Sequence, residues 1–213
     1  MKFLFIVQGE GRGHLTQAIT LEEMLLRNGH EVVEVLVGKS SSRTLPGFFN
    51  RNIHAPVKRF ISPNFQPTAD NKRADLKKSF AYNLLRFPEY FRSMCYINQR
   101  IKETGAEVVI NFYELLTGLT YALFRPSIPY VCIGHQYLFL HQDFDFPDKS
   151  SIQLWMLRFF TRMTALRSSK KLALSFLEME QDDMNQIVTV PPLIRQEVTA
   201  IRPEKGDYIH GYM

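Results

Sequence analysis

The chain has 213 residues, of which 45% are hydrophobic and 22% charged, a composition typical of a folded globular protein with one large domain or one domain and part of another. Its net charge of +5 favours phosphorylated molecules and anionic lipids as partners, and no recognisable nucleic-acid-binding motif occurs. The two cysteines are far apart, which argues against a disulfide framework, and no apolar stretch reaches the length of about 18 residues that a membrane span needs. We therefore expect a cytoplasmic protein.

Short apolar runs alternate with helical patterns along the chain, which is typical of a parallel sheet covered by helices. Strands are predicted over 3–7, 31–37, 57–61, 107–111, 130–133, 171–174 and 187–190. Helices are predicted over 15–27, 75–101 with an interruption at Pro88, 115–124 and 152–167. Prolines break the pattern between residues 39 and 71, where the strand 57–61 is the only element expected. The predicted fold class is α/β, a doubly wound, Rossmann-like parallel sheet.

A glycine-rich loop that ends in histidine follows the first predicted strand: Gly9-Glu10-Gly11-Arg12-Gly13-His14. Ligands of doubly wound sheets bind at the carboxyl ends of the strands, where this loop lies. Glycines let a ligand approach the backbone, and the free N–H groups at the start of the next helix favour an anion. Arg12 adds a positive charge, and His14 is a candidate general base at neutral pH.

Two other interpretations of this loop are weaker. A tight turn without a ligand needs fewer than three glycines. A dinucleotide site would have a third glycine where His14 stands, and the nearest candidate for its acidic ribose partner, Glu34, lies inside a predicted strand.

Residues 9–18, Gly-Glu-Gly-Arg-Gly-His-Leu-Thr-Gln-Ala, resemble the first loop and helix of GT-B glycosyltransferases related to the lipid-linked N-acetylglucosaminyltransferase of peptidoglycan synthesis. They are even more similar to a set of predicted bacterial and archaeal glycosyltransferases with the motif Gly-x-Gly-Arg-Gly-His. Residues 109–114 match a family strand, with Glu114 at the glutamate position and Phe112 in place of an aspartate. Residues 128–136 match the next strand, which ends in His-Gln.

The resemblance implies an N-terminal, acceptor-side domain over residues 1–195. Residues 191–195 and 206–209 resemble the exit from that domain and the opening of the next, so 196–213 would be a linker and the first strand of a truncated C-terminal domain. The full enzyme would transfer a sugar from a nucleotide-sugar to an acceptor hydroxyl, and this half alone would be inactive. The donor would be a substrate, with no tightly bound cofactor.

Two alternatives to sugar transfer stay open: a nucleotide-sugar epimerase of the same architecture, and a non-catalytic module that binds a phosphorylated or lipid-linked ligand. The expected partners of the transferase are the nucleotide-sugar, an acceptor that includes lipid-linked candidates, and the missing C-terminal domain. Nucleic acid is not expected.

The resemblance also assigns site residues. His14 would be the base or an orienting group, and Glu114 would orient His14 or bind an acceptor hydroxyl. The expected donor-binding residues come from the glycine-rich loop and the segment after the fifth predicted strand: Gly9, Gly11, Arg12, Gly13, His135 and Gln136. The loose spacing of the acidic residues near His141 does not favour a metal site.

Two segments, 72–92 and 154–167, mix basic and apolar residues. Such a mixture suits peripheral contact with the anionic inner face of a membrane, as for an enzyme with a lipid-linked acceptor. It equally suits a helix whose apolar side chains face the sheet. We expect the second arrangement for 154–167, whereas both remain open for 72–92.

Overall fold

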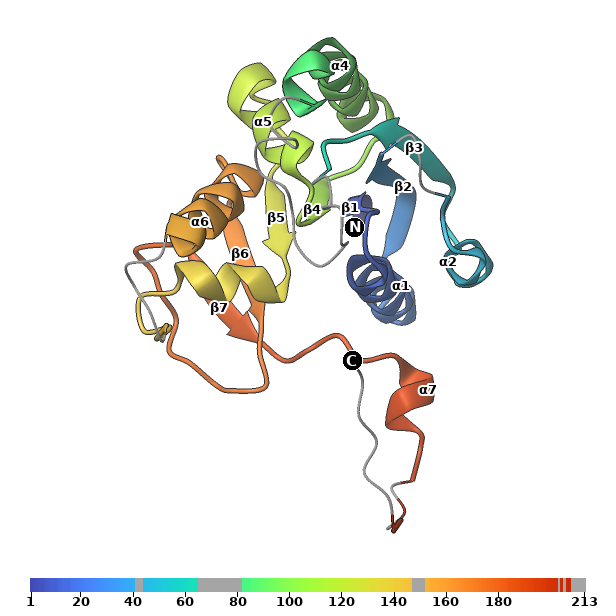
Figure 1. The fold of residues 1–213 in the computed structure, drawn as a ribbon. Helices are drawn as coiled ribbons and strands as arrows, with labels where there is room; N and C mark the ends of the chain where they lie inside the picture. The colour runs from blue at the N-terminus through green and yellow to red at the C-terminus, as the bar shows by residue number, and fades with distance from the viewer. Residues whose placement is uncertain (41–43, 65–81, 147–151, 203, 205, 208–213) are drawn as a thin grey trace.

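The computed structural model describes residues 1–40, 44–64, 82–146, 152–202, 204, 206 and 207 (Figure 1). Its centre is a seven-stranded sheet in the order β3-β2-β1-β4-β5-β6-β7, in which all neighbouring strands are parallel. The strands are β1 (Lys2–Gln8), β2 (Glu31–Lys39), β3 (Val57–Ile61), β4 (Val108–Phe112), β5 (Tyr130–Ile133), β6 (Lys170–Leu174) and β7 (Ile187–Val190). This is the doubly wound α/β fold that the sequence predicts.

Helices cover both faces of the sheet (Figure 1). They are α1 (Arg12–Arg27), α2 (Gly47–Asn52), α4 (Phe87–Glu103), α5 (Leu115–Phe124), the 3-10 helix η1 (His135–Leu140), α6 (Ile152–Thr164) and α7 (Gln196–Thr199). The helices α1 and α2 lie on one face, α4 and α5 lie on the other, and α6 packs beside α5.

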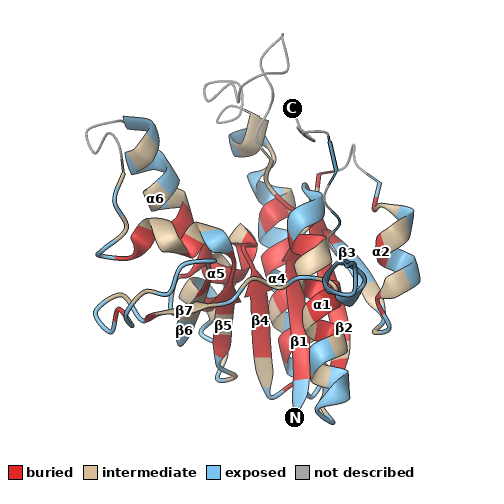
Figure 2. Cartoon of the chain, turned by 90° about the horizontal axis from the view of Figure 1, so that it is seen from below, coloured by how far each residue is buried: buried red, intermediate tan, exposed pale blue. Residues whose placement is uncertain are grey.

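The alternation of side chains along β1 divides the core into two halves. Phe3, Phe5 and Val7 pack on the face that carries α1, whereas Leu4 and Ile6 pack on the face that carries α4. A strand buried on both faces has to be apolar throughout, which explains the uninterrupted run at 3–7. Figure 2 shows the buried residues along the central strands and the inner sides of the helices.

All seven predicted strands are confirmed, with ends that differ by at most two residues. The helix 115–124 is also confirmed, and α1 begins three residues before the predicted start. Pro88 lies in the first turn of α4, where a proline is tolerated, and residues 82–85 before it are helical. The first part of the predicted helix 75–101 falls on residues 75–81, outside the described part of the chain.

Three short helices were not expected, and one predicted helix ends early. The helix α2 was not expected, because its six residues are too few for a periodic pattern; its Phe49 is fully buried against the core. The 3-10 helix η1 and the four-residue helix α7 were not expected either. The predicted helix 152–167 ends at Thr164, and Arg167 has a left-handed backbone with φ of 64°.

The segment after β7 runs back toward α1. Arg27 Nη1 donates to Gln196 Oε1 at 3.0 Å, which attaches α7 to the end of α1. Most of the first C-terminal strand expected at the end of 196–213 lies outside the described residues, because residues 208–213 are not described. The domain boundary at residue 195 therefore remains a prediction.

Candidate active site

The candidate site lies where the order of the strands reverses. The strand β1 is flanked by β2 on one side and by β4 on the other. The chain therefore leaves the carboxyl ends of β1 and β4 toward opposite faces of the sheet, which opens a crevice between these two strands. A cavity of about 500 Å³ lies at this edge. Its lining includes residues at the ends of four strands: Gln8 at the end of β1 and His14 after it, Ser62 and Asn64 after β3, Glu114 after β4 and Gln136 after β5.

The glycine-rich loop joins β1 to α1 and exposes the start of that helix. The Gly9 N–H donates to the Gly38 carbonyl oxygen at 2.7 Å, so this amide extends the sheet and is not free for a ligand. A β-carbon at Gly9 would lie 2.6 Å from Val37 Cγ1, which explains the need for glycine there. Gly11 caps α1 without a side-chain hydrogen bond, and a β-carbon at Gly11 or Gly13 would meet only open space.

The start of α1 is therefore the part of the loop that can receive an anion. Its first turn has no acidic residue, and exposed Arg12 adds a positive charge. The N–H groups of a first helical turn and the helix dipole both favour a negative group at this position.

His14 lies in the first turn of α1 with only 8% of its surface exposed. Its Nδ1 is 3.2 Å from Gln17 Oε1, and its Nε2 is 3.2 Å from Gln136 Nε2. Its ring stacks on Tyr113 with 5.6 Å between ring centroids, and it lies parallel to the ring of His135 at 6.4 Å. Burial is the main cause that lowers the pKa of His14 to about 4; the Gln17 hydrogen bond opposes this shift and nearby His135 adds to it, so the ring is neutral at physiological pH.

Glu114 is fully buried at the start of α5. Its Oε1 accepts hydrogen bonds from Ser62 Oγ at 2.6 Å and from the Leu116 N–H at 3.1 Å, whereas its Oε2 has no hydrogen-bond partner. Burial raises the pKa of Glu114 to about 7, against the opposing effect of these hydrogen bonds. Gly38 leaves room for the carboxylate, because a β-carbon there would lie 2.3 Å from Oε2.

The turn between β4 and α5 is held by a buried amide. Asn111 Oδ1 accepts from the Glu114 N–H at 2.9 Å, and Asn111 Nδ2 donates to the Thr164 carbonyl oxygen at 2.9 Å. Tyr113 between them has a left-handed backbone with φ of 61°, which is uncommon for a residue other than glycine. Such backbone strain is concentrated at functional sites, and here it directs the Tyr113 ring against His14.

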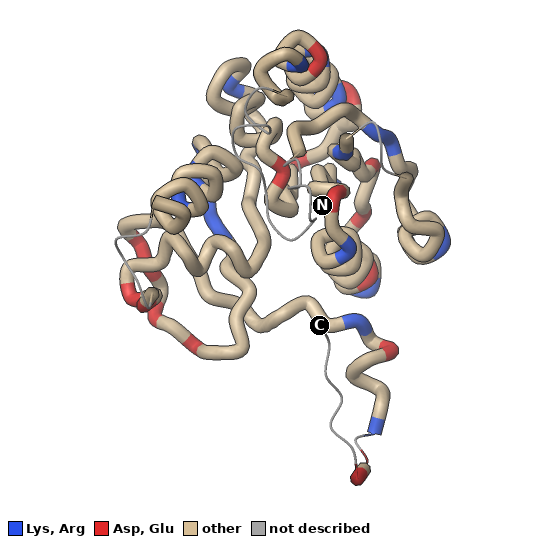
Figure 3. The backbone as a smooth tube through the Cα atoms, in the orientation of Figure 1, with Lys and Arg blue, Asp and Glu red and all other residues tan. Residues whose placement is uncertain are grey.

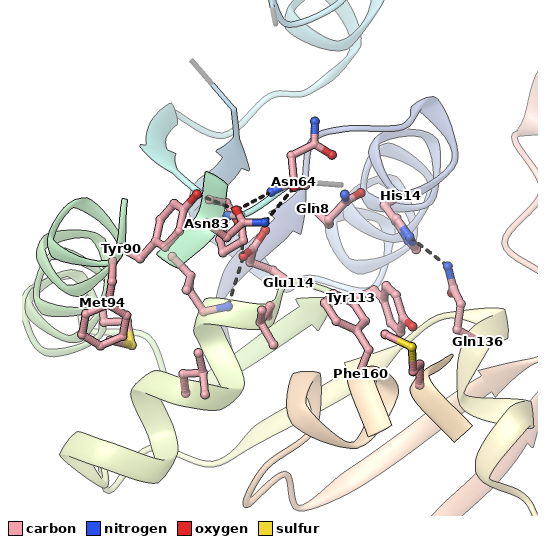
Figure 4. A pocket seen from close by; sticks show the side chains of 17 residues that line it. Gln8, His14, Asn64, Asn83, Tyr90, Met94, Tyr113, Glu114, Gln136 and Phe160 are labelled. Carbon is pink, nitrogen blue, oxygen red and sulfur yellow. Dashed lines mark hydrogen bonds between the residues drawn. The ribbon is translucent and has the colours of Figure 1, made fainter. Parts of the chain in front are cut away.

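The sequence-predicted site residues come together in part. His14 and Gln136 meet (Figure 4), and the ring of His135 lies parallel to that of His14. These residues follow β1 and β5, which are separated by β4 in the sheet. Glu114 lines the same cavity, but its Oε1 accepts from Ser62 and from the start of α5, and neither oxygen has a hydrogen bond with His14, so the structure does not support the expectation that it orients His14. Phe112, which replaces the family's aspartate, is buried against Phe5 in the core.

Several residues that shape the site were missed in the sequence. Gln17 lies one helical turn after His14, and that spacing of three residues was the available signal. Asn64 and Asn83 form a polar corner of the cavity. There Asn83 Nδ2 donates to the Asn64 carbonyl oxygen at 3.0 Å, and Tyr90 donates to Asn83 Oδ1 at 2.7 Å (Figure 4). No sequence pattern indicates that these distant residues meet.

Most of the remaining cavity wall is apolar. It comprises Pro63, Phe87, Met94, Leu115, Leu116, Leu119, Met156 and Phe160. An apolar cavity with a few polar groups at defined positions is the usual form of a small-molecule site.

His141 has a structural role. Its Nε2 lies 2.9 Å from the Glu180 carbonyl oxygen, and its Nδ1 accepts from the Asp143 N–H at 3.2 Å, so both ring nitrogens have partners. Within the described ranges, no group of three or more histidine, cysteine or acidic side chains has the arrangement of a metal site.

Known structures share this fold. UGT2 of Phytolacca americana, solved with UDP-2-fluoro-glucose and pterostilbene, superposes with a TM-score of 0.57 at 14% identity over 92% of this chain and 55% of its own. UGT89C1 of Arabidopsis thaliana, solved with UDP, superposes with a TM-score of 0.52 at 16% identity over 91% of this chain and 49% of its own. The kitacinnamycin glycotransferase gives 0.53 at 13% identity over 100% and 60%. The chain thus spans about half the length of these proteins.

No curated protein sequence matches the chain. The family model "Glycosyl transferase family 1", however, matches residues 1–213. With the sheet order and the structural neighbours, this match confirms the resemblance of the glycine-rich loop. The chain belongs to glycosyl transferase family 1 and has the fold of the N-terminal half of a GT-B glycosyltransferase.

Proposed function

We propose that this domain is the acceptor-binding half of an enzyme that transfers a sugar from a nucleoside diphosphate sugar to an acceptor hydroxyl. The observation that carries the proposal is the position of His14. This neutral, buried histidine lies in the wall of the 500 Å³ cavity, in the first turn of the helix whose uncapped start can receive a phosphate. A base and an anion-binding helix end, side by side, are what sugar transfer from a diphosphate requires.

The chemistry follows from these two groups. The acceptor hydroxyl donates its hydrogen to His14 Nε2, and its oxygen attacks the anomeric carbon of the donor. The bond from that carbon to the phosphate oxygen breaks, and its electron pair goes to the leaving diphosphate. The N–H groups at the start of α1, together with Arg12, stabilise the added negative charge, while the proton stays on His14.

Glu114 is proposed to bind a polar group of the acceptor. Glu114 lines the cavity and its buried Oε2 has no hydrogen-bond partner, which is costly unless a ligand satisfies it. The apolar residues around it would contact the rest of the acceptor. An acceptor that combines a hydroxyl with an apolar body fits this lining best.

The proposed donor is a nucleotide-sugar used as a substrate, with His135 and Gln136 facing its sugar and phosphates. Support comes from the neighbours, since UGT2 of Phytolacca americana was solved with a UDP-sugar and UGT89C1 with UDP. Most of the nucleotide would be bound by a second domain, consistent with the half-length coverage of those chains. The family match supports transfer over the epimerase and the binding module.

We also propose peripheral contact with an anionic membrane through α6, and a lipid-linked acceptor remains among the candidates. The expectation that the apolar residues of 154–167 face the sheet was wrong for four of them: Trp155, Met156, Leu157 and Phe159 are exposed by 61%, 36%, 37% and 49%. This helix has two arginines and no acidic residue (Figure 3). None of the helices within the described ranges is long and apolar enough to cross a membrane.

The test of the proposed base is His14→Gln in the complete enzyme that contains this domain. Glutamine keeps the approximate size and polarity of the side chain but cannot take a proton. We expect kcat to fall by about 10²–10⁴-fold, the usual contribution of a general base, in a nucleotide-sugar transfer assay.

The matched control is His54→Gln, since His54 is an exposed histidine before β3. Its activity should equal that of the wild type. Unchanged transfer by His14→Gln, with the same thermal stability, would exclude His14 as the base.

A further inference from the structure

The base has an unusual partner. His14 Nδ1 lies 3.2 Å from Gln17 Oε1, one turn further along α1, and the helix fixes this spacing. Among the described residues, the ring nitrogens of His14 have hydrogen bonds only with the side-chain amides of Gln17 and Gln136. No carboxylate of that part of the chain takes the place that an aspartate has in a His–Asp pair.

The two amides together define one tautomer. The Gln17 oxygen can only accept, so Nδ1 must carry the hydrogen. The Gln136 nitrogen can only donate, so Nε2 must carry the lone pair. A free imidazole prefers its hydrogen on Nε2, and the protein has to hold the opposite tautomer in place for Nε2 to act as a base.

We propose that Gln17 is the positioning residue that fixes His14 in its Nδ1–H tautomer and so presents the Nε2 lone pair to the acceptor cavity. Its catalytic meaning rests on the proposed function, but the tautomer itself does not. Gln136, whose amide occupies Nε2 without an acceptor present, holds the place that the acceptor hydroxyl takes, and its own Oε1 has no hydrogen-bond partner.

A neutral partner has a further consequence. The Gln17 hydrogen bond favours the protonated ring, but it does not offset the desolvation that lowers the pKa of His14. The titratable groups that face the ring are Tyr113 and His135, and the charge of His135 acts in the same direction as burial. A carboxylate at position 17 would therefore make His14 a stronger base without moving it.

Long-range ¹H–¹⁵N correlation spectra of this chain, labelled with ¹⁵N-histidine, test the proposal without any assay of transfer. We expect the wild type to show a protonated Nδ1 and an unprotonated Nε2 for His14. Gln17→Leu removes the acceptor at similar size and should move the hydrogen to Nε2 in most molecules. Gln136→Leu, the matched control on the other side of the ring, should leave the hydrogen on Nδ1.

A wild-type His14 with its hydrogen on Nε2 would overturn the proposal. So would a change of tautomer in Gln136→Leu and not in Gln17→Leu. Gln17→Glu keeps the acceptor oxygen, which guards against misfolding of the leucine variant: it should retain the Nδ1–H tautomer and raise the pKa of His14 by at least about one unit, a tenfold change in proton affinity. An unchanged pKa in that variant would also contradict the proposal.

Transfer assays on the complete enzyme distinguish the proposed role of His14 as the base from the proposed role of Gln17 in positioning its ring. Gln17→Leu should lower kcat at nearly constant KM for the acceptor, and Gln17→Glu should restore it. If His14→Gln is fully active while the spectra show the expected tautomers, the proposed base is wrong and the role of Gln17 in positioning the ring stands.

Discussion

Two buried titratable side chains dominate the site at the scale of single residues. Burial lowers the pKa of His14 to about 4 and raises that of Glu114 to about 7, so each side chain resists its charged form. Both pKa shifts make the free energy of unfolding depend on pH, because the same groups titrate near their ordinary values of 6.5 and 4.5 in the unfolded chain.

The two shifts act on stability at different pH. For His14 the unfolded chain binds the proton more tightly than the folded chain. The contribution of its pKa shift to the stability of the folded state is therefore complete above pH 6.5 and is lost as pH falls toward 4. For Glu114 the folded chain binds the proton more tightly than the unfolded chain. The contribution of its pKa shift to the stability of the folded state is therefore complete below pH 4.5 and is lost as pH rises through 7. Each shift corresponds to an upper limit of about 3 kcal/mol.

Glu114→Gln tests the second of these signs. The amide keeps the shape of the side chain and cannot ionise, so the variant should be more stable than the wild type at pH 8 by about 1–3 kcal/mol and nearly equal at pH 5. Urea unfolding at the two pH values measures this difference. Glu178→Gln, a change at an exposed glutamate, should show no such dependence, and a Glu114→Gln variant less stable at pH 8 would contradict the shift.

At the scale of elements, glycines decide how closely parts of the chain approach. Gly118 in α5 lies against the backbone of α6, where an added β-carbon would be 2.1 Å from the Met163 carbonyl oxygen. A main-chain atom in a helix cannot move aside as a flexible side chain can. The crossing of α5 and α6 also positions Thr161, whose hydroxyl hydrogen bonds with that of Tyr113 in the site at 2.8 Å.

Gly118→Ala should therefore destabilise the protein by about 1–3 kcal/mol, the usual cost of overpacking. Gly13→Ala is the matched control, because Gly13 is also helical but an added β-carbon meets nothing within 4 Å. We expect that control to be neutral or to stabilise by up to about 1 kcal/mol. Equal unfolding midpoints for the two variants in urea would show that α5 and α6 do not approach so closely.

At the scale of the whole molecule, the cavity at the carboxyl ends of the strands and the exposed apolar residues of α6 lie together. The helices α4 and α6 both contribute to the cavity wall, through Phe87 and through Met156 and Phe160. Next to these residues, Trp155 and Phe159 stack in parallel at 5.4 Å on the exposed side of α6. A membrane-bound α6 would place the cavity close to the lipid surface from which an amphipathic acceptor enters.

The double variant Trp155→Glu/Phe159→Glu tests this contact. In the bound state the two aromatic side chains would be buried in the membrane, which stabilises binding by about 1.5–3 kcal/mol each. Their loss should weaken binding to phosphatidylglycerol vesicles by at least about tenfold in a sedimentation assay. Met24→Glu/Leu26→Glu on α1, with exposed fractions of 42% and 43%, is the control on the other face of the sheet. Equal loss in the control, or no binding by the wild type, would refute the proposed contact.

The sequence by itself determined the sheet and the edge at which the site lies. Short apolar runs predicted all seven strands, and in central strands such as β1 these runs are buried on both faces. The edge strand β3 also carries exposed Lys58 and Arg59. The loop 9–14 indicated the edge of the sheet at which the candidate site lies for a local reason: glycines are required where the backbone approaches another atom, as at Gly9. The meeting of His14 with Gln136 followed from their positions after strands of one sheet.

Only the tertiary structure decided the partners and the ionisation of the site. The spacing along the chain could not show that Glu114 hydrogen bonds with Ser62 while His14 hydrogen bonds with Gln17. These contacts depend on how far each turn extends from the end of its strand. Nor could it show the direction in which the two pKa values shift, since burial in the folded core is the main cause of both. Local pattern determines where a strand ends, and packing determines what its last side chain touches.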